Sequence, residues 1–161
     1  MKTLTDLLEH ELQDLYSAEN QLIEALPTMV KEAADKKLKK AFEQHLEETK
    51  KHAERIKEVC DELGLSHSGH KCKAMAGLIE EAKSFLKEEM TDEVKNAGMI
   101  AAAQRVEHYE IAGYGTAVRY AKELGHKNAA STLQRTLDEE YTTDEKLNDM
   151  AEDRLNRKAI K

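Results

Sequence analysis

Apolar residues recur every three or four positions along most of this chain, which is the period of a helix with one buried face. The first such run begins at Thr3 or Thr5 and continues past Pro27, whose ring predicts a kink or a break about one turn earlier. The second run starts after Asp35, a residue suited to the N-cap, and ends at Gly64. We therefore expect two long helices joined by a tight turn.

The second half of the chain repeats this arrangement after a long connection. Residues 65–72, LSHSGHKC, are the clearest loop, and residues 72–90 follow as a shorter amphipathic helix. A third long pattern covers about 92–124, and a fourth runs from about 127 into the charged C-terminal tail. Connections that are short, long and short predict an all-α, ferritin-like four-helix bundle with one long crossover carrying a short fifth helix.

Composition agrees with a single helical domain over residues 1–161, because this length suits one core and aromatic residues are only 4% of the chain. The net charge of -7 argues against a nucleic-acid surface, and no run approaches the ~18 apolar residues of a membrane span. The charged N-terminus is not a secretory signal. The two cysteines, Cys60 and Cys72, form no disulfide framework and fit a reducing compartment. We expect a cytoplasmic protein that binds neither nucleic acid nor membrane.

Polar residues interrupt the apolar stripe of every long helix. Counted from the nearest turn, they fall at nearly the same depth, so all four helices present acids or imidazole at one level of the bundle. These candidates are Glu19 in the first helix, His45, Glu48 and His52 in the second, Glu107 and Glu110 in the third, and Glu140 and Asp144 in the fourth.

This shared level predicts a metal centre. Six carboxylates in one interior repel one another unless cations neutralise them, because an unpaired buried charge costs several kcal/mol. Two divalent transition metals would supply that charge, and carboxylate with imidazole suits Fe or Mn. An inward Glu on each helix, with His at helical spacing, is typical of di-iron and di-manganese bundles. The expected ligands are Glu19, Glu48, Glu110 and Glu140, with His45 or His52 supplying nitrogen and Glu107 or Asp144 bridging or just outside.

Five segments also carry a family resemblance. They are DLYSAENQL, HLEETKKHAERI, KCKAMAGLIEEA, AAAQRVEHYEIAGYGT and TLDEEYTTDEKL, and together they span nearly the whole chain. The chain resembles the YciE/YciF-like family of bacterial ferritin-like stress proteins. This resemblance implies a ferritin-like fold with a fifth helix, a di-metal centre, a homodimer and an association with stress, but no assigned reaction.

The order of the candidate ligands departs from that of ferritin-like iron sites. Those sites pair Glu with His three residues later, whereas here His45 precedes Glu48, and the fourth helix has no His at this level. A site poor in nitrogen favours Mn, a mixed pair or partial filling. Glu47 and Glu139 would replace their neighbours if the register were shifted by one, and nearby tyrosines could hold ligand carboxylates in place.

Two functions follow from these patterns, and enzyme activity is left open. The first is a di-metal carboxylate protein that reacts with peroxide or O₂ in stressed cells. The alternative is a non-catalytic helical stress protein, with a vestigial or structural polar core, that acts through its surface or its dimer interface. The cluster HSGHKC has no second Cys/His pair at matching spacing, so an exposed loop is favoured over a zinc site.

Overall fold

Capping residues set the ends of the long helices. The computed structural model describes residues 1–160, in which α1 spans Leu4–Glu32 and its N-cap Thr3 forms a capping box with Asp6. The next helix begins after the N-cap Asp35 and ends at Gly64, whose left-handed φ of 66° closes it. The remaining elements are α2 Lys36–Leu63, α3 Lys73–Phe85, α4 Asp92–Glu123, α5 Lys127–Met150, a π-helical turn Ala151–Leu155 and α6 Asn156–Lys158.

The first helix continues through Pro27 without a break. Breakage was one of the two predicted outcomes, and it is wrong. The proline ring fixes φ near the helical value, so its cost is limited to one lost hydrogen bond and local crowding. Leu22 and Leu26 are both buried on the turns before the proline, and this packing holds the helix in place.

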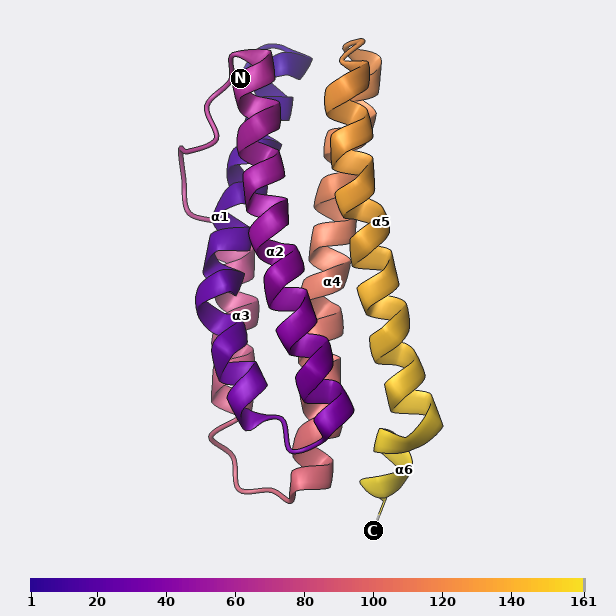
Figure 1. Ribbon diagram of the computed structural model, residues 1–161. Coiled ribbons are helices and arrows are strands. Elements are labelled where there is room, and N and C mark those ends of the chain that lie inside the picture. The colour runs from indigo at the N-terminus through magenta and orange to yellow at the C-terminus, as the bar shows by residue number, and fades with distance from the viewer. Residues whose placement is uncertain (161) are drawn as a thin grey trace.

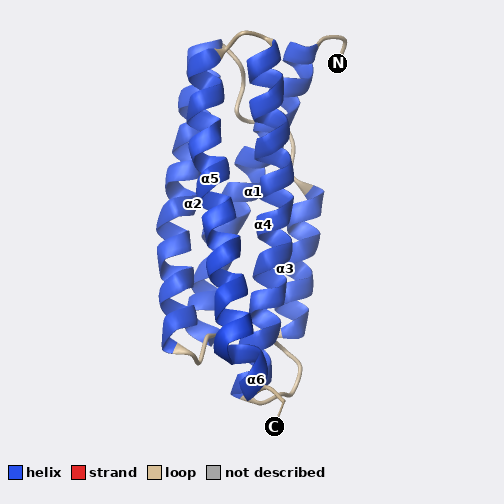
Figure 2. Cartoon of the chain, turned by 90° about the vertical axis from the view of Figure 1, so that its right-hand side faces the viewer, coloured by secondary structure: helices blue, strands red, loops and turns tan. Residues whose placement is uncertain are grey.

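The four long helices form the predicted bundle (Figure 1). The hairpin partners α1 and α2 pack together, as do α4 and α5, and the hairpins meet through contacts of α1 with α4 and of α2 with α5. The crossover helix α3 lies against α1 and α4 on the outside of the bundle (Figure 2). Residues 1–160 contain no strand. The all-α class and the single long crossover are therefore confirmed.

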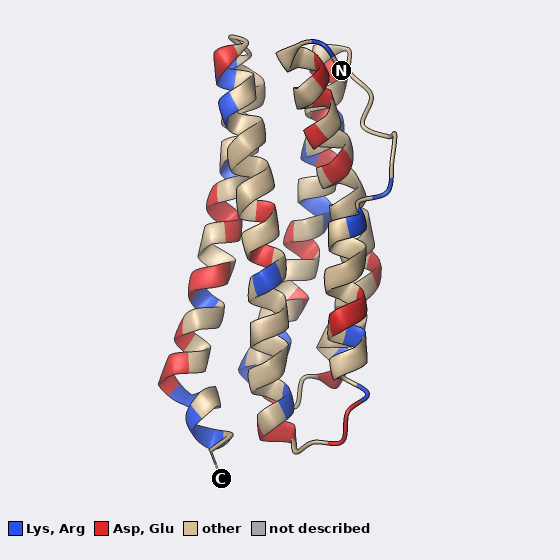
Figure 3. Cartoon of the chain, turned by 180° about the vertical axis from the view of Figure 1, so that it is seen from behind, with Lys and Arg blue, Asp and Glu red and all other residues tan. Residues whose placement is uncertain are grey.

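The C-terminal end of the chain is tied to the turn between α1 and α2. Arg154, in the π-helical turn, donates two hydrogen bonds to Asp35, one of them 2.9 Å long from Nη2 to Oδ1. From the other side, Asn96 Oδ1 accepts the backbone N–H groups of Ala34 at 3.1 Å and Asp35 at 3.3 Å. Lys and Arg are interspersed with Asp and Glu along the helices (Figure 3). Close to the C-terminus, Lys and Arg gather.

The core consists of two apolar clusters, one on each side of a polar layer. Along every long helix, the buried acids and histidines lie between the residues of one cluster and those of the other. The first cluster includes Leu8, Leu12, Leu15, Ile56, Tyr114 and Leu133, and the second includes Leu26, Leu38, Phe42, Met75, Met99 and Leu147. The polar layer is therefore closed off along the bundle axis.

Both cysteines are free, as predicted, and both are buried. The loop 65–72 is largely exposed apart from Cys72, and the groups of residues 1–160 that could hold a metal include none of its side chains. None of the helices in residues 1–160 is both long and apolar enough to cross a membrane.

Candidate metal centre

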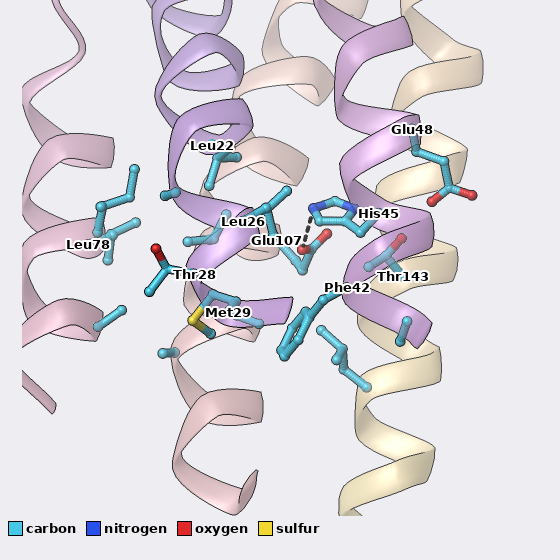
Figure 4. Close-up of a pocket in the computed structure, with 18 of the residues that line it drawn as sticks. Leu22, Leu26, Thr28, Met29, Phe42, His45, Glu48, Leu78, Glu107 and Thr143 are labelled. Carbon is cyan, nitrogen blue, oxygen red and sulfur yellow. Dashed lines mark ion pairs between the residues drawn. The ribbon is translucent and has the colours of Figure 1, made fainter. Parts of the chain in front are cut away.

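Four side chains from three helices meet in the polar layer. His45 comes from α2, Glu107 and Glu110 from α4, and Glu140 from α5, and each offers one ligand atom within 4.8 Å of the others. His45 Nε2 lies 3.1 Å from Glu107 Oε1 (Figure 4). All four residues are buried. This group combines one imidazole with three carboxylates, a set suited to Fe or Mn.

A second group adjoins the first and shares one residue with it. Glu19 of α1, His52 of α2 and Glu140 of α5 offer atoms that also lie within 4.8 Å of one another. His52 Nδ1 lies 2.9 Å from Glu140 Oε1 and 3.6 Å from Glu19 Oε1. Glu140 therefore belongs to both groups, which is the position that a bridging carboxylate would take.

Residues outside the two groups orient the second one. Glu139 Oε2 lies 2.8 Å from His52 Nε2, so the Nδ1 atom of the ring faces Glu19 and Glu140. Arg55 donates to both oxygens of Glu139, at 2.6 and 3.0 Å. The Tyr114 hydroxyl donates to Glu19 Oε1. Such partners fix the direction in which a potential ligand presents its free atom.

Two of the eight predicted ligands lie outside both groups. Glu48 is half-buried, and its Oε1 accepts a 2.7 Å hydrogen bond from Gln44. Asp144 is also half-buried; it accepts a 3.1 Å hydrogen bond from Gln104 and lies 3.3 Å from the exposed His108. The structure thus brings six of the predicted residues together and leaves these two apart, and metal binding by the six stays a prediction.

The side chains of the polar layer have unused hydrogen-bonding capacity. In residues 1–160, His67 Nδ1 is the only buried side-chain N or O atom without a hydrogen-bond partner that lies outside the two groups. The short distances between the histidine nitrogens and the carboxylate oxygens are thus close contacts whose angles do not meet those of a hydrogen bond. Buried polar atoms of folded proteins are nearly always paired, so a cluster of unpaired ones indicates a missing partner. The unpaired atoms of the groups are Glu19 Oε2, both ring nitrogens of His45, His52 Nδ1, and both oxygens of Glu107, Glu110 and Glu140.

Burial raises the pKa of three of the four carboxyl groups. It raises the pKa of Glu19 to about 8 and that of Glu107 to about 7. Burial and the neighbouring acids raise the pKa of Glu110 well above its ordinary value. Burial acts in the same direction on Glu140, but contact with His52 outweighs it and holds the pKa of Glu140 below its ordinary value. One acid of the four is therefore firmly ionised.

The pKa values of the two histidines are also raised, although burial acts on them in the opposite direction. Burial lowers their pKa values, but the nearby carboxylates outweigh it and raise the pKa of His45 to about 10 and that of His52 to about 9. Without metal, protons balance the charge of the layer. With all protons removed, the four glutamates carry four negative charges, which two divalent cations would neutralise. The donor set, its charge and its unpaired atoms therefore fit two such ions.

Comparison with known proteins supplies the family. Residues 3–160 match the family model described as "Domain of unknown function (DUF892)". The chain belongs to this family. It is 48% identical to Protein YciF of Escherichia coli K12 over 160 residues, which cover 99% of this chain and 96% of YciF. The predicted resemblance to YciF-like proteins is confirmed.

Three solved structures have the same fold. The crystal structure of the E. coli stress protein YciF aligns with a TM-score of 0.93 at 48% identity, covering 97% of this chain and 99% of that one. YcfI from Rhodopseudomonas palustris gives 0.89 at 44% identity, with 92% and 94% covered. A protein from Xanthomonas campestris gives 0.75 at 25% identity, with 93% and 92% covered.

Sequence reasoning identified the supporting residues of this DUF892 chain only in part. A tyrosine bound to a ligand carboxylate was allowed for, and Tyr114 fills that role toward Glu19. Glu139 was considered as a substitute ligand, but the structure places it behind His52. Arg55 was missed, although it lies one helical turn after His52 and is the nearest cation on that face of α2.

Proposed function

We propose that this chain is a di-metal carboxylate protein that binds two divalent transition metals, Fe or Mn, and reacts with peroxide or O₂ in stressed cells. The observation that carries this proposal is the sharing of Glu140 between two buried groups of potential ligands. The association with stress is supported by similarity to YciF, whose crystal structure is described as that of a stress protein.

Each residue of the layer has a role in this proposal. His45, Glu107 and Glu110 would hold one ion, Glu19 and His52 would hold the other, and Glu140 would bridge them. Bound Fe or Mn would supply one-electron chemistry toward the oxidant.

The protein itself sets the direction of the ligands. His52 directs its Nε2–H toward Glu139, which turns Nδ1 into the layer, where a metal would replace the proton on that atom. Tyr114 holds one oxygen of Glu19, so the other oxygen is free. The apolar clusters on both sides exclude water and strengthen the electrostatic interactions within the layer.

The proposal is tested first by metal content. Protein purified without chelator should contain about two Fe or Mn ions per chain by elemental analysis, because the layer offers two ligand groups. Glu140→Ala should lose both ions, since it removes the shared ligand. Glu19→Ala should retain one ion, because the group containing His45 stays complete.

Glu48→Ala is the matched control. It removes the same charge from the same level of the bundle, at a half-buried residue that belongs to neither group, and should retain both ions. A chain that takes up no metal and whose melting temperature does not respond to Fe²⁺ or Mn²⁺ would contradict the proposal and favour a non-catalytic stress protein. A loaded chain that consumes neither peroxide nor O₂ would contradict the reaction but not the site. We also expect a homodimer, which light scattering can check.

A further inference from the structure

An apolar cavity of about 60 Å³ adjoins the candidate metal centre (Figure 4). Its walls include side chains from all five of the longer helices. His45 and Glu107 stand at its inner side, and Leu22, Leu26 and Phe42 surround them in the close-up. The cavity therefore reaches two of the residues that would hold a metal.

The cavity also has margins at the protein surface. Thr28 of α1 and Lys83 of α3 are exposed on one side, and Gln44 of α2 and Lys146 of α5 are exposed on the other. On the side of Thr28 and Lys83, the other lining residues between the margin and His45 are apolar, among them Leu22, Leu26 and Leu78. The cavity is thus placed as a route from solvent to the polar layer.

The size of the cavity limits what can occupy it. A water molecule needs roughly 10–15 Å³ of such volume, whereas drug-sized ligands occupy pockets of about 300–1,000 Å³. A volume of about 60 Å³ accommodates a diatomic or similarly small molecule and excludes a typical organic substrate.

The polarity of the walls separates the two oxidants of the proposed function. The half-buried Glu48 lies at the margin, where it accepts a hydrogen bond from Gln44. Inside the margins, the polar groups are His45, Glu107 and Thr143, and the Thr143 hydroxyl already donates to the Glu139 carbonyl at 3.1 Å. Hydrogen peroxide would lose hydrogen bonds with water on entering such a space, at a cost in free energy. Dioxygen makes no strong hydrogen bonds with water, so apolar walls favour it.

We infer that this cavity admits dioxygen, and not hydrogen peroxide, to the candidate metal centre. The inference rests on the proposed function and names its oxidant. It concerns the passage and binding of O₂ by this chain's own apolar residues, so it can be examined in metal-free protein.

The test in metal-free protein uses the paramagnetism of O₂. Methyl groups of Leu22, Leu26 and Leu147 should show enhanced NMR relaxation under O₂ pressure relative to N₂, beyond that of exposed methyl groups. Xenon, which enters apolar cavities, should bind at the same place in a pressurised crystal. Ala103→Leu, one turn before Glu107, fills the cavity and should abolish both signals. Ala101→Leu is the matched control, because Ala101 is exposed and lies outside this cavity.

The test in Fe²⁺-loaded protein separates the oxidants. Two Fe²⁺ ions supply two electrons, and solvent supplies two protons, to reduce one O₂ to H₂O₂ or one H₂O₂ to two H₂O. Ala103→Leu should slow the oxidation by O₂ and leave that by peroxide unchanged relative to Ala101→Leu. Ala41→Leu, which fills the cavity from α2, should repeat the effect if Ala103→Leu does not fold.

Each outcome bears on one claim. Absence of the O₂ and xenon signals in the metal-free wild type would overturn the inference whatever the metal content. Equal slowing of both oxidants, or of neither, would overturn it as well. Failure to bind metal would be seen by elemental analysis alone and would instead overturn the proposed function.

Discussion

Replacing Glu110 by leucine should stabilise the metal-free protein and destabilise it relative to wild type once metal is present. Glu110 is fully buried, and neither of its oxygens has a hydrogen-bond partner among residues 1–160. A metal ligand in such a place would lower the stability of the metal-free protein, as functional residues often do. The opposite signs of the two effects distinguish a ligand from a structural polar core.

The magnitude follows from the unpaired carboxyl group. A buried polar group without a partner costs about 1–3 kcal/mol, so metal-free Glu110→Leu should be more stable by about that amount. For a chain of this size 1 kcal/mol corresponds to about 2–4 °C, so the melting temperature should rise by roughly 2–12 °C. A metal present at 1,000 times its dissociation constant stabilises the folded state by about 4.1 kcal/mol per site. The variant keeps only the group of Glu19, His52 and Glu140, so wild type, with one more filled site, would then exceed it.

The gain should also depend on pH, with a defined sign. The pKa of Glu110 is raised in the folded protein by burial and nearby acids, from an ordinary value of 4.5. Above pH 4.5 the unfolded state binds fewer protons at this residue than the folded state does, so the stability of wild type falls as pH rises. The advantage of leucine should therefore be larger at pH 7 than at pH 4.5.

The assay is thermal unfolding by circular dichroism, with chelator or with Mn²⁺, in wild type and Glu110→Leu. Glu48→Leu is the control, because Glu48 is half-buried, belongs to neither ligand group and should not change the response to Mn²⁺. Lower stability of Glu110→Leu in chelator would refute the view that the carboxyl group is unpaired. An equal Mn²⁺ response in wild type and variant would refute its role as a ligand.

Three further predictions concern protons, the support of the site and the C-terminal contact. Loading two divalent metals at pH 7 should release about four protons, because Glu19, Glu110, His45 and His52 hold protons when no metal is bound. Calorimetry in buffers of different ionisation enthalpy measures the number released, and release of one proton or none would contradict the prediction. Glu139→Ala should weaken metal binding by about 10–100-fold, because it removes the group that orients His52, and an unchanged titration would contradict that role. Arg154→Ala should destabilise the fold by about 1 kcal/mol at pH 7, since it breaks the contact with Asp35. Hydrogen bonding to Arg154 holds the pKa of Asp35 below its ordinary 3.8, so the difference in unfolding free energy should shrink below that pH, and a constant difference would contradict the contact.

The bundle could be predicted because its signals are local. A cap acts within one turn of its own helix, so Thr3, Asp35 and Gly64 marked the ends of α1 and α2 in sequence and in structure. The contact of Arg154 with Asp35 joins residues 119 apart and depends on a π-helical turn, for which the hydrophobic pattern gave no sign. Such contacts depend on the assembled bundle and are not encoded in local periodicity.

The level of the candidate site along the bundle axis could be predicted more closely than the side to which each of its residues turns. Periodicity places a residue at a level of the bundle, but residues on the edge of a stripe can turn either way. Glu48 lies about 60° around α2 from His45, and this rotation takes it to the margin beside Gln44. Glu139 and Glu140 are adjacent and about 100° apart, so only the packing of α5 against α2 decides which one enters the layer.

Anomalous diffraction at the metal edge, from a crystal grown with Mn²⁺ or Fe²⁺, tests the central claim most directly. The account predicts two peaks in the polar layer, one beside His45, Glu107 and Glu110 and the other beside Glu19 and His52, with Glu140 between them. A single peak, or peaks only at acids outside the two groups, such as Asp144, would contradict it.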